Sequence, residues 1–242
     1  MLRNIRYNAL VLKVKAVGQS HREAWFLSAE SGILHATVFG GPRSHLKGAV
    51  APFHQGNLLL YYNPVKDYAK VTEFDVCTWR PGLREDYQRL MAAFALTETI
   101  LSSYGSGGTW HEALNIAEAT LDAYTEASEQ LYRPLAVHFL WHWISLLGLN
   151  PSLEHCDRCG ALLSAHALTF FVHGSLVCES CTHDGLALGA GARRWLHSIG
   201  QIPACSIARY SASPASISQA KNFVTVLLRE SLGKRIQTWE II

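Results

Sequence analysis

Two pairs of closely spaced cysteines constrain the fold more than any other feature of this 242-residue chain. The first pair is Cys156 and Cys159, the second is Cys178 and Cys181, and eighteen residues separate the pairs. Because each C-x2-C turn can aim two thiolates at one ion, two such turns complete a tetrahedron of sulfur ligands. The spacing predicts a metal site made of these four cysteines, with zinc as the expected ion.

The segment between the two pairs predicts a zinc ribbon inserted at about residues 153–184. Residues 169–173 and 175–177 are rich in β-forming side chains and are joined at Gly174, which is typical of a hairpin. Four thiolates leave no coordination position for water, so we expect a structural ion and no catalytic metal. Cysteines packed without a metal remain the alternative.

Other nearby residues leave the ligand set open. Three histidines can each replace one thiolate, although we expect them at the surface or behind the ligands: His155, His173 and His183. We interpret the two unpaired cysteines, Cys77 and Cys205, as small buried residues. Four of six cysteines in such pairs fit a reducing cytoplasm better than a disulfide framework.

The first 80 residues predict a small antiparallel barrel. Short runs of alternating or β-branched residues end at glycine and proline turns, and they predict strands at residues 7–17, 24–28, 33–39, 57–62 and 70–79. Five is the strand number of an OB-fold. An SH3-like barrel and a two-sheet sandwich are the alternatives.

Residues 81–242 predict a helical domain that carries the zinc insertion. After Pro81 the apolar residues recur at helical spacing. We expect helices at about residues 83–101, 109–128, 131–148, 190–199 and 216–232. The helix at 131–148 has apolar residues on nearly every side, so it should be the central one. The fold class is therefore α+β.

Charge is distributed unevenly between these two parts. Residues 1–80 contain ten Lys and Arg against five Asp and Glu, a net charge of +5, whereas residues 81–242 have a net charge of −3. A polyanion is therefore expected to meet the N-terminal part first. The hydrophobic content of 49% provides for a folded core and excludes global disorder.

The loop at residues 40–48 is the strongest candidate for a phosphate contact. It joins two predicted strands and contains Arg43, His45 and Lys47. Further cations extend the basic surface: Arg3, Arg6, Lys13, Lys15 and Arg22. Bases can stack on aromatic residues of the barrel, but we expect most of these to be core: Trp25, Phe39, Tyr61 and Tyr62.

Signatures of catalysis and of membrane insertion are missing from the sequence. It contains no GxSxG, GxxxxGK[ST], HExxH or GxGxxG, so we expect no enzymatic activity. The longest apolar stretch, between Arg133 and Gly148, contains two histidines and is too short to span a bilayer. With no secretory signal visible, we expect a cytoplasmic protein.

Together these features resemble the bacterial DNA repair protein RecO family. The resemblance lies in the strand that starts at Tyr7, the 40–47 loop followed by Pro52-Phe53, the helix running into Cys156-Asp-Arg-Cys159, and the last helix with its Leu-Leu-Arg-Glu-Ser-Leu-Gly-Lys ending. It extends over almost the whole chain.

The resemblance implies a recombination mediator associated with the nucleoid. Such proteins bind single- and double-stranded DNA, anneal complementary strands and pair with RecR. Together they help to load RecA onto strands coated by SSB, whose acidic C-terminal tail they bind. Two other functions remain as alternatives: a protein-interaction scaffold with little DNA binding, and a zinc hydrolase in which water displaces one thiolate.

Overall fold

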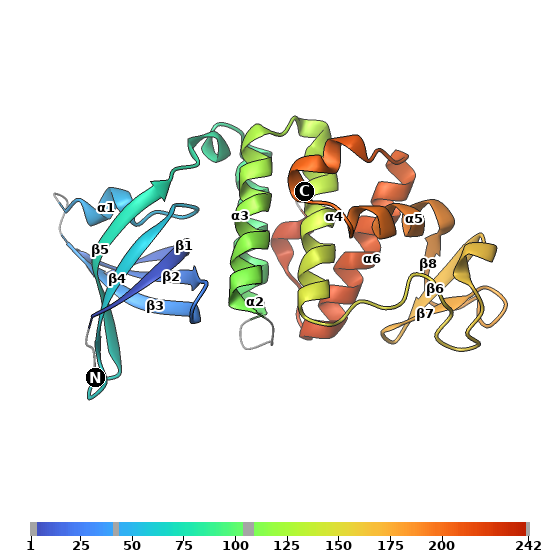
Figure 1. Cartoon of the computed structure of the whole chain (residues 1–242), viewed down its shortest axis with the longest axis horizontal. Coiled ribbons are helices and arrows are strands. Elements are labelled where there is room, and N and C mark those ends of the chain that lie inside the picture. Colours follow the sequence, from blue (N-terminus) through green and yellow to red (C-terminus); the bar gives the residue numbers. More distant parts are fainter. Residues whose placement is uncertain (1–3, 41–43, 104–108, 241–242) are drawn as a thin grey trace.

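The N-terminal strands form a closed barrel in the computed structural model, which describes residues 4–40, 44–103 and 109–240 (Figure 1). The strand order around the barrel is β1-β2-β3-β5-β4. The strands are β1 (Asn4–Val17), β2 (His21–Ser28), β3 (Gly32–Phe39), β4 (Gln55–Asn63) and β5 (Tyr68–Thr78). Helix α1 (Leu46–Ala49) follows β3 and packs Leu46 into the barrel interior. A closed five-stranded barrel of this kind confirms the predicted OB-like fold.

Strand β1 is buried on both of its sides. Ala9 and Val11 point into the barrel, whereas Leu10 and Leu12 belong to the core of the helical body. The pairing register with β2 shifts between Val11 and Lys13, which marks a β-bulge. The bulge changes which residues face outward, so that Lys13 lies on the same side of the strand as Leu10.

The barrel packs directly against the helices. Leu27 and Phe53 join Leu10 and Leu12 in the main core, and helices α2 and α3 contact β1. Buried Arg80, which follows β5, reinforces this junction: its Nε lies 2.6 Å from Asp122 Oδ1 and its Nη1 donates to the Phe53 carbonyl at 2.9 Å.

Helices form the middle of the molecule, between the barrel at one end and a small sheet at the other (Figure 1). They are α2 (Tyr87–Ser102), α3 (Trp110–Glu126), α4 (Glu129–Leu146), α5 (Ala190–Ile199) and α6 (Pro214–Leu232). Helix α4 contacts each of the other four, and eleven of its eighteen residues are buried. The prediction that this helix is central is confirmed. Short 3-10 turns connect the elements: η1 (Pro81–Arg84), η2 (Leu163–Ala165), η3 (Ala204–Arg209) and η4 (Gln237–Glu240).

The helix starts differ from the expected ones. Helix α4 begins at Glu129, so Pro134 lies inside the helix and not in its first turn. Thr109 immediately precedes α3, and its hydroxyl donates to the Glu112 carboxylate. Helix α6 is capped by Ser213, whose Oγ accepts from Ser216 N–H.

The C-terminal sheet has three strands in the order β7-β6-β8. The predicted hairpin is confirmed as β6 (Leu168–Val172) and β7 (Ser175–Cys178), joined by His173 and Gly174 with positive φ. Strand β8 (Leu186–Gly189) was not predicted, because its four residues lead straight into α5. Within the described ranges, no helix is long and apolar enough to cross a membrane.

Candidate metal centre and nucleic-acid interface

The four paired cysteines meet at one point of the C-terminal sheet. The Sγ atoms of Cys156, Cys159, Cys178 and Cys181 all lie within 4.8 Å of one another. Cys156 and Cys178 are buried, Cys181 is half-buried and Cys159 is exposed. The four side chains can therefore hold one metal ion near the edge of the protein.

Two tight turns aim these sulfurs. Gly160 N–H donates to the Cys156 carbonyl at 2.9 Å, and Cys181 N–H donates to the Cys178 carbonyl at 3.0 Å. Gly160 has φ +73°, a conformation that glycine adopts without strain. The two turns are joined directly, because Cys178 N–H points at Cys156 Sγ at 3.3 Å.

The sulfur cluster has the dimensions of a tetrahedral thiolate site. Four sulfurs about 2.3 Å from a zinc-sized ion are about 3.8 Å apart, and Cys159 Sγ and Cys178 Sγ are 3.7 Å apart. Burial raises the pKa of Cys156, but three backbone N–H groups outweigh it and bring that pKa to about 6. Hydrogen bonds to the sulfurs of Cys159 and Cys178 raise the pKa of Cys181 to about 12. A cation is what allows all four to be thiolates together.

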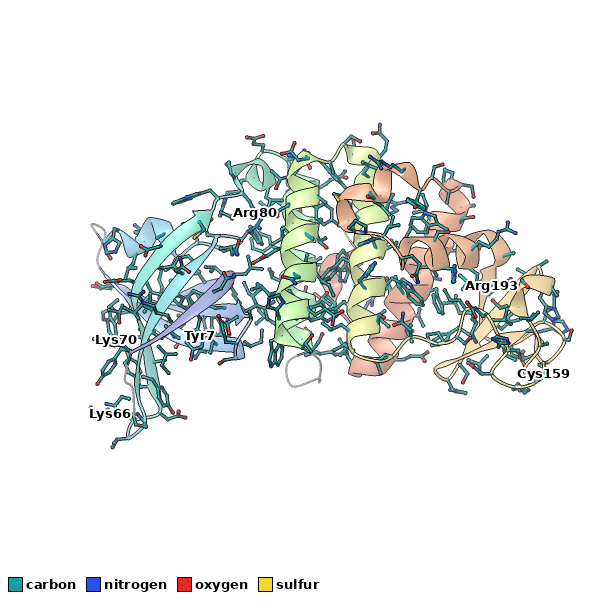
Figure 2. All side chains as sticks on the ribbon, in the orientation of Figure 1. Tyr7, Lys66, Lys70, Arg80, Cys159 and Arg193 are labelled. Carbon is teal, nitrogen blue, oxygen red and sulfur yellow. The ribbon has the colours of Figure 1, made fainter. Side chains whose placement is uncertain are left out.

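Side chains around the cysteines fix the sheet to the helical body. Asp157 Oδ2 accepts from Leu176 N–H at 2.7 Å, and Arg158 Nη1 donates to the Cys181 carbonyl at 2.6 Å. Buried Arg193 reaches from α5 toward the sheet and donates to the carbonyls of Leu163 and His166 (Figure 2).

The alternative ligands and the unpaired cysteines lie apart from this cluster. Among the described residues, the group that can hold a metal consists of the four cysteines. The three nearby histidines are exposed: His155, His173 and His183. The expectation that Cys77 and Cys205 are buried is wrong, since both are exposed. Cys77 alternates along β5 with inward-facing residues and therefore faces out.

The outer surface of β1, β2 and β3 brings cations and rings together in rows. Lys13 of β1 pairs with Trp25 of β2, and Trp25 in turn pairs with His35 of β3. Two residues further along each strand the row is Lys15, Glu23 and Thr37, and the next one is Val17, His21 and Phe39. We call this surface the barrel face and define it by six residues: Lys13, Lys15, His21, Trp25, His35 and Phe39.

Contacts within the barrel face hold the rings in place. The rings of Trp25 and His35 stack with centroids 4.6 Å apart, and Lys13 Nζ lies 5.5 Å from the Trp25 ring. His21 meets Phe39 edge to face at 4.7 Å. Glu23 is the acidic residue in these rows, and its carboxylate lies 3.8 Å from His35.

The barrel face continues onto the β4–β5 hairpin. Thr37 of β3 pairs with Lys70 of β5, and Lys70 Nζ lies 5.1 Å from the Tyr61 ring. Figure 2 shows Lys66 at the tip of the same hairpin and Lys70 nearer the barrel. In OB-folds the surface of strands 2 and 3, together with this loop, is where oligonucleotides bind.

The predicted contact residues divide into separate groups. Lys13 and Lys15 are exposed side by side on the barrel face, and His45 and Lys47 are exposed on the α1 segment. Arg6 is exposed on β1, but buried Leu10 separates it from Lys13. Two of the predicted contacts, Arg3 and Arg43, lie outside the described residues.

Arg22 has an internal role. Arg22 lies two residues before the inward-facing Ala24 on β2, so its side chain leaves the strand on the same side. Its guanidinium donates to the carbonyls of Leu46, Lys47 and Val50 at 3.0–3.3 Å. The Leu46 carbonyl also accepts from Val50 N–H at 2.9 Å, so the guanidinium is a second donor to it, and together the three bonds tie α1 to β2. Arg22 therefore holds the loop that presents His45 and Lys47.

The barrel aromatics were expected to be mainly core, and this expectation is wrong for the four that were considered. Phe39 and Tyr62 are exposed, and Trp25 and Tyr61 are half-buried on the outer surface. Strand parity would have shown this for Trp25, since Ala24 and Phe26 fill the interior on either side of it. His21 and His35 were missed as members of the same surface.

Comparison with known sequences gives these features a family. The model described as "Recombination protein O N terminal" matches residues 1–79, and "Recombination protein O C terminal" matches residues 84–240. The chain belongs to the RecO family. Membership of the RecO family assigns the chain a role in DNA repair and recombination.

Individual RecO relatives are similar over most of the chain. A DNA repair protein RecO of Maridesulfovibrio salexigens is 26% identical over 200 residues, which is 79% of this chain and 80% of the relative. One from an Anaeromyxobacter species is 25% identical and covers 96% of this chain and 93% of the relative. One from Pelobacter propionicus is 33% identical over 108 residues, 43% of this chain and 42% of the relative.

Proposed function

We propose that this RecO-family chain is a recombination mediator that binds single- and double-stranded DNA and anneals complementary strands. With RecR it would assist the loading of RecA onto DNA coated by SSB, and it would bind the acidic C-terminal tail of SSB. It acts by binding, without catalysing a reaction, in the cytoplasm at the nucleoid. The barrel face is the single observation that best supports the DNA-binding part of this function.

The chemistry of the barrel face suits a single strand best. Each unpaired base offers a flat surface to a ring such as Trp25 or Phe39, and base–aromatic stacking contributes about 1–3 kcal/mol per base. Lys13 and Lys15 lie beside these rings, where they can neutralise the phosphates that follow the stacked bases. Double-stranded DNA keeps its bases stacked, so only the cations of the face would bind it, and binding would be weaker.

We propose zinc as the ion held by the four cysteines. Four thiolates are the usual ligands of structural zinc and leave no open coordination position. In this role the ion orders the sheet that β6, β7 and β8 form at the end of the helical body. It stabilises the protein and takes no part in DNA chemistry.

Salt-dependent binding of oligo(dT) tests the DNA-binding proposal. We expect Lys13→Gln with Lys15→Gln to weaken binding and to lower the slope of log K against log salt by roughly 0.7 for each lost phosphate contact. Arg194→Gln with Arg209→Gln removes two exposed charges outside the barrel and serves as the control. If the barrel variant binds as tightly as wild type at every salt concentration, the barrel face is not the DNA site.

Annealing of complementary oligonucleotides tests the mediator role. We expect the wild-type protein to accelerate annealing, with and without SSB on the strands, and the barrel-face variant to do so several-fold more slowly. A protein that binds RecR or SSB but neither binds nor anneals DNA would be the interaction scaffold instead.

A further inference from the structure

The chain after α6 folds back along that helix. Gly233 ends α6 in the left-handed conformation, with φ +63°, which turns the backbone sharply. The following segment is anchored on α2, because buried Trp239 donates its Nε1–H to Thr99 Oγ1 at 2.8 Å. The turn therefore places Lys234 and Arg235 beside the outer surface of α6.

A hollow of about 350 Å³ lies between α6 and this returning segment. It contains four cations, Lys221, Arg229, Lys234 and Arg235, and no acidic residue of the described chain lines it. Ser218 and Asn222 complete its polar lining, together with Thr225, whose hydroxyl donates to the Lys221 carbonyl at 2.7 Å. We call this space the α6 hollow.

Three of the four cations of the α6 hollow have no carboxylate partner among the described residues. In the part of the chain that the structure describes, Lys221, Arg229 and Lys234 form no ion pair. Cations near a helix C-terminus offset its partial negative charge, which accounts for Arg229. This effect does not account for Lys221, which is half-buried and lies three turns before the end of α6. Burial and the neighbouring Arg133 lower the pKa of Lys221.

We propose that the α6 hollow binds a phosphate group of a nucleic-acid strand, at a site separate from the barrel face. A phosphate offers several acceptor oxygens to the surrounding ammonium, guanidinium, hydroxyl and amide donors. The apolar lining residues Leu228, Ile236 and Trp239 are themselves buried, at 2%, 6% and 1% exposure. A fourth apolar lining residue, Val226, is half-buried. Four cations with no carboxylate among the described lining residues are what favour a phosphate as the ligand.

This second site gives the chain a means of holding two strands, and in that respect it rests on the proposed function. The barrel lies at one end of the molecule, and α6 lies in the helical body beyond α3 (Figure 1). A strand stacked on the barrel face and another held by its phosphates at α6 would both be bound to one chain. Simultaneous binding of this kind would bring two complementary strands together for annealing.

Lysine acetylation of the wild-type protein, followed by mass spectrometry of its peptides, maps both sites separately. With saturating oligo(dT) we expect Lys221 and Lys234 to be acetylated several-fold more slowly, together with Lys13 and Lys15. Parallel samples contain thymidine monophosphate, inorganic phosphate or a polyglutamate peptide. The wild-type protein is used, so the folding of a variant does not affect the result.

Each outcome decides the proposal. Protection of Lys221 and Lys234 by oligo(dT) supports binding at the α6 hollow. If Lys13 and Lys15 react as before in the same sample, the barrel site is refuted and the hollow is not. Protection by thymidine monophosphate or phosphate but not by oligo(dT) would assign the hollow to a free phosphate compound and overturn the strand-binding role. Protection by polyglutamate alone, or no protection at all, would overturn the proposal.

A variant provides an independent readout. Lys221→Gln with Lys234→Gln should slow the annealing of two strands several-fold while the binding of one short strand at the barrel changes little. Arg194→Gln with Arg209→Gln is again the charge-matched control, and circular dichroism checks the fold. Annealing at the wild-type rate by a correctly folded hollow variant would contradict a two-strand role.

Discussion

Buried arginines act as structural connectors at both ends of this molecule. Arg80 joins the barrel to α3, and Arg193 joins α5 to Thr169 of the sheet that carries the cysteines. Arg22 does the same for the α1 loop. From the sequence, Arg22 was predicted to contact DNA, because composition and clustering do not distinguish a cation whose donors serve backbone carbonyls from one that faces solvent.

The role of Arg193 predicts a large difference between two adjacent arginines. Arg193→Met removes the buried guanidinium that donates to the carbonyls of Leu163 and His166 and to Thr169 Oγ1, and it should lower the free energy of unfolding by roughly 3 kcal/mol. Arg194→Met, on the exposed side of the same turn, should change it by less than about 0.5 kcal/mol. Urea unfolding measures both, and equal effects would disprove the connector role.

His138 predicts a specific pH dependence of stability. It is buried, and burial followed by the charge of His142 lowers its pKa to about 4. The unfolded chain, with a pKa of 6.5, therefore binds a proton first as the pH falls. The free energy of unfolding should decrease by about 1.4 kcal/mol per pH unit below 6.5, until the folded pKa is reached.

His138→Gln should remove this contribution, so that its stability varies less between pH 7 and pH 5 than that of the wild type. The matched control is His197→Gln, which changes an exposed histidine of α5 and should keep the wild-type slope. Urea titrations at several pH values give the slopes. Parallel curves for wild type and His138→Gln would show that His138 is not responsible.

At the scale of elements, periodicity predicted the structure well wherever one side of an element is buried. All five barrel strands, the ribbon hairpin and five long helices are found close to their expected positions. Prediction failed where a local interaction overrides the pattern. The bulge in β1 changes which residues face outward, and the Ser213 cap starts α6 at Pro214, two residues before the expected position.

The sheet that carries the four cysteines should depend on the proposed zinc ion, whereas the barrel should not. The barrel interior forms its own core cluster, whereas Cys156 and Cys178 belong to the core shared with the helices. Removal of the ion, or Cys178→Ser, should therefore speed amide exchange in β6 and β7 by orders of magnitude. Exchange in β2 and β3 should stay as in wild type, and a uniform loss of protection would contradict this separation.

At the scale of the whole molecule, the sequence predicted the order of its parts but only some of the candidate site. The cysteine spacing was sufficient to predict the sulfur cluster, because each C-x2-C turn is a local feature of the sequence. The barrel face depends on pairing between three strands, which places Lys13, Trp25 and His35 in one row. The α6 hollow depends on a chain reversal, and no local pattern indicated it.

The central claim is that the barrel face stacks the bases of a single strand, and Trp25 tests it most directly. We would measure oligo(dT) binding by Trp25→Thr and by Trp79→Thr, which removes an exposed tryptophan next to His54, outside the barrel face. The account predicts that Trp25→Thr weakens binding roughly 5- to 150-fold, the equivalent of one lost base stack, and that Trp79→Thr binds as wild type does. Wild-type affinity in a folded Trp25→Thr protein, or an equal loss in both variants, would contradict it.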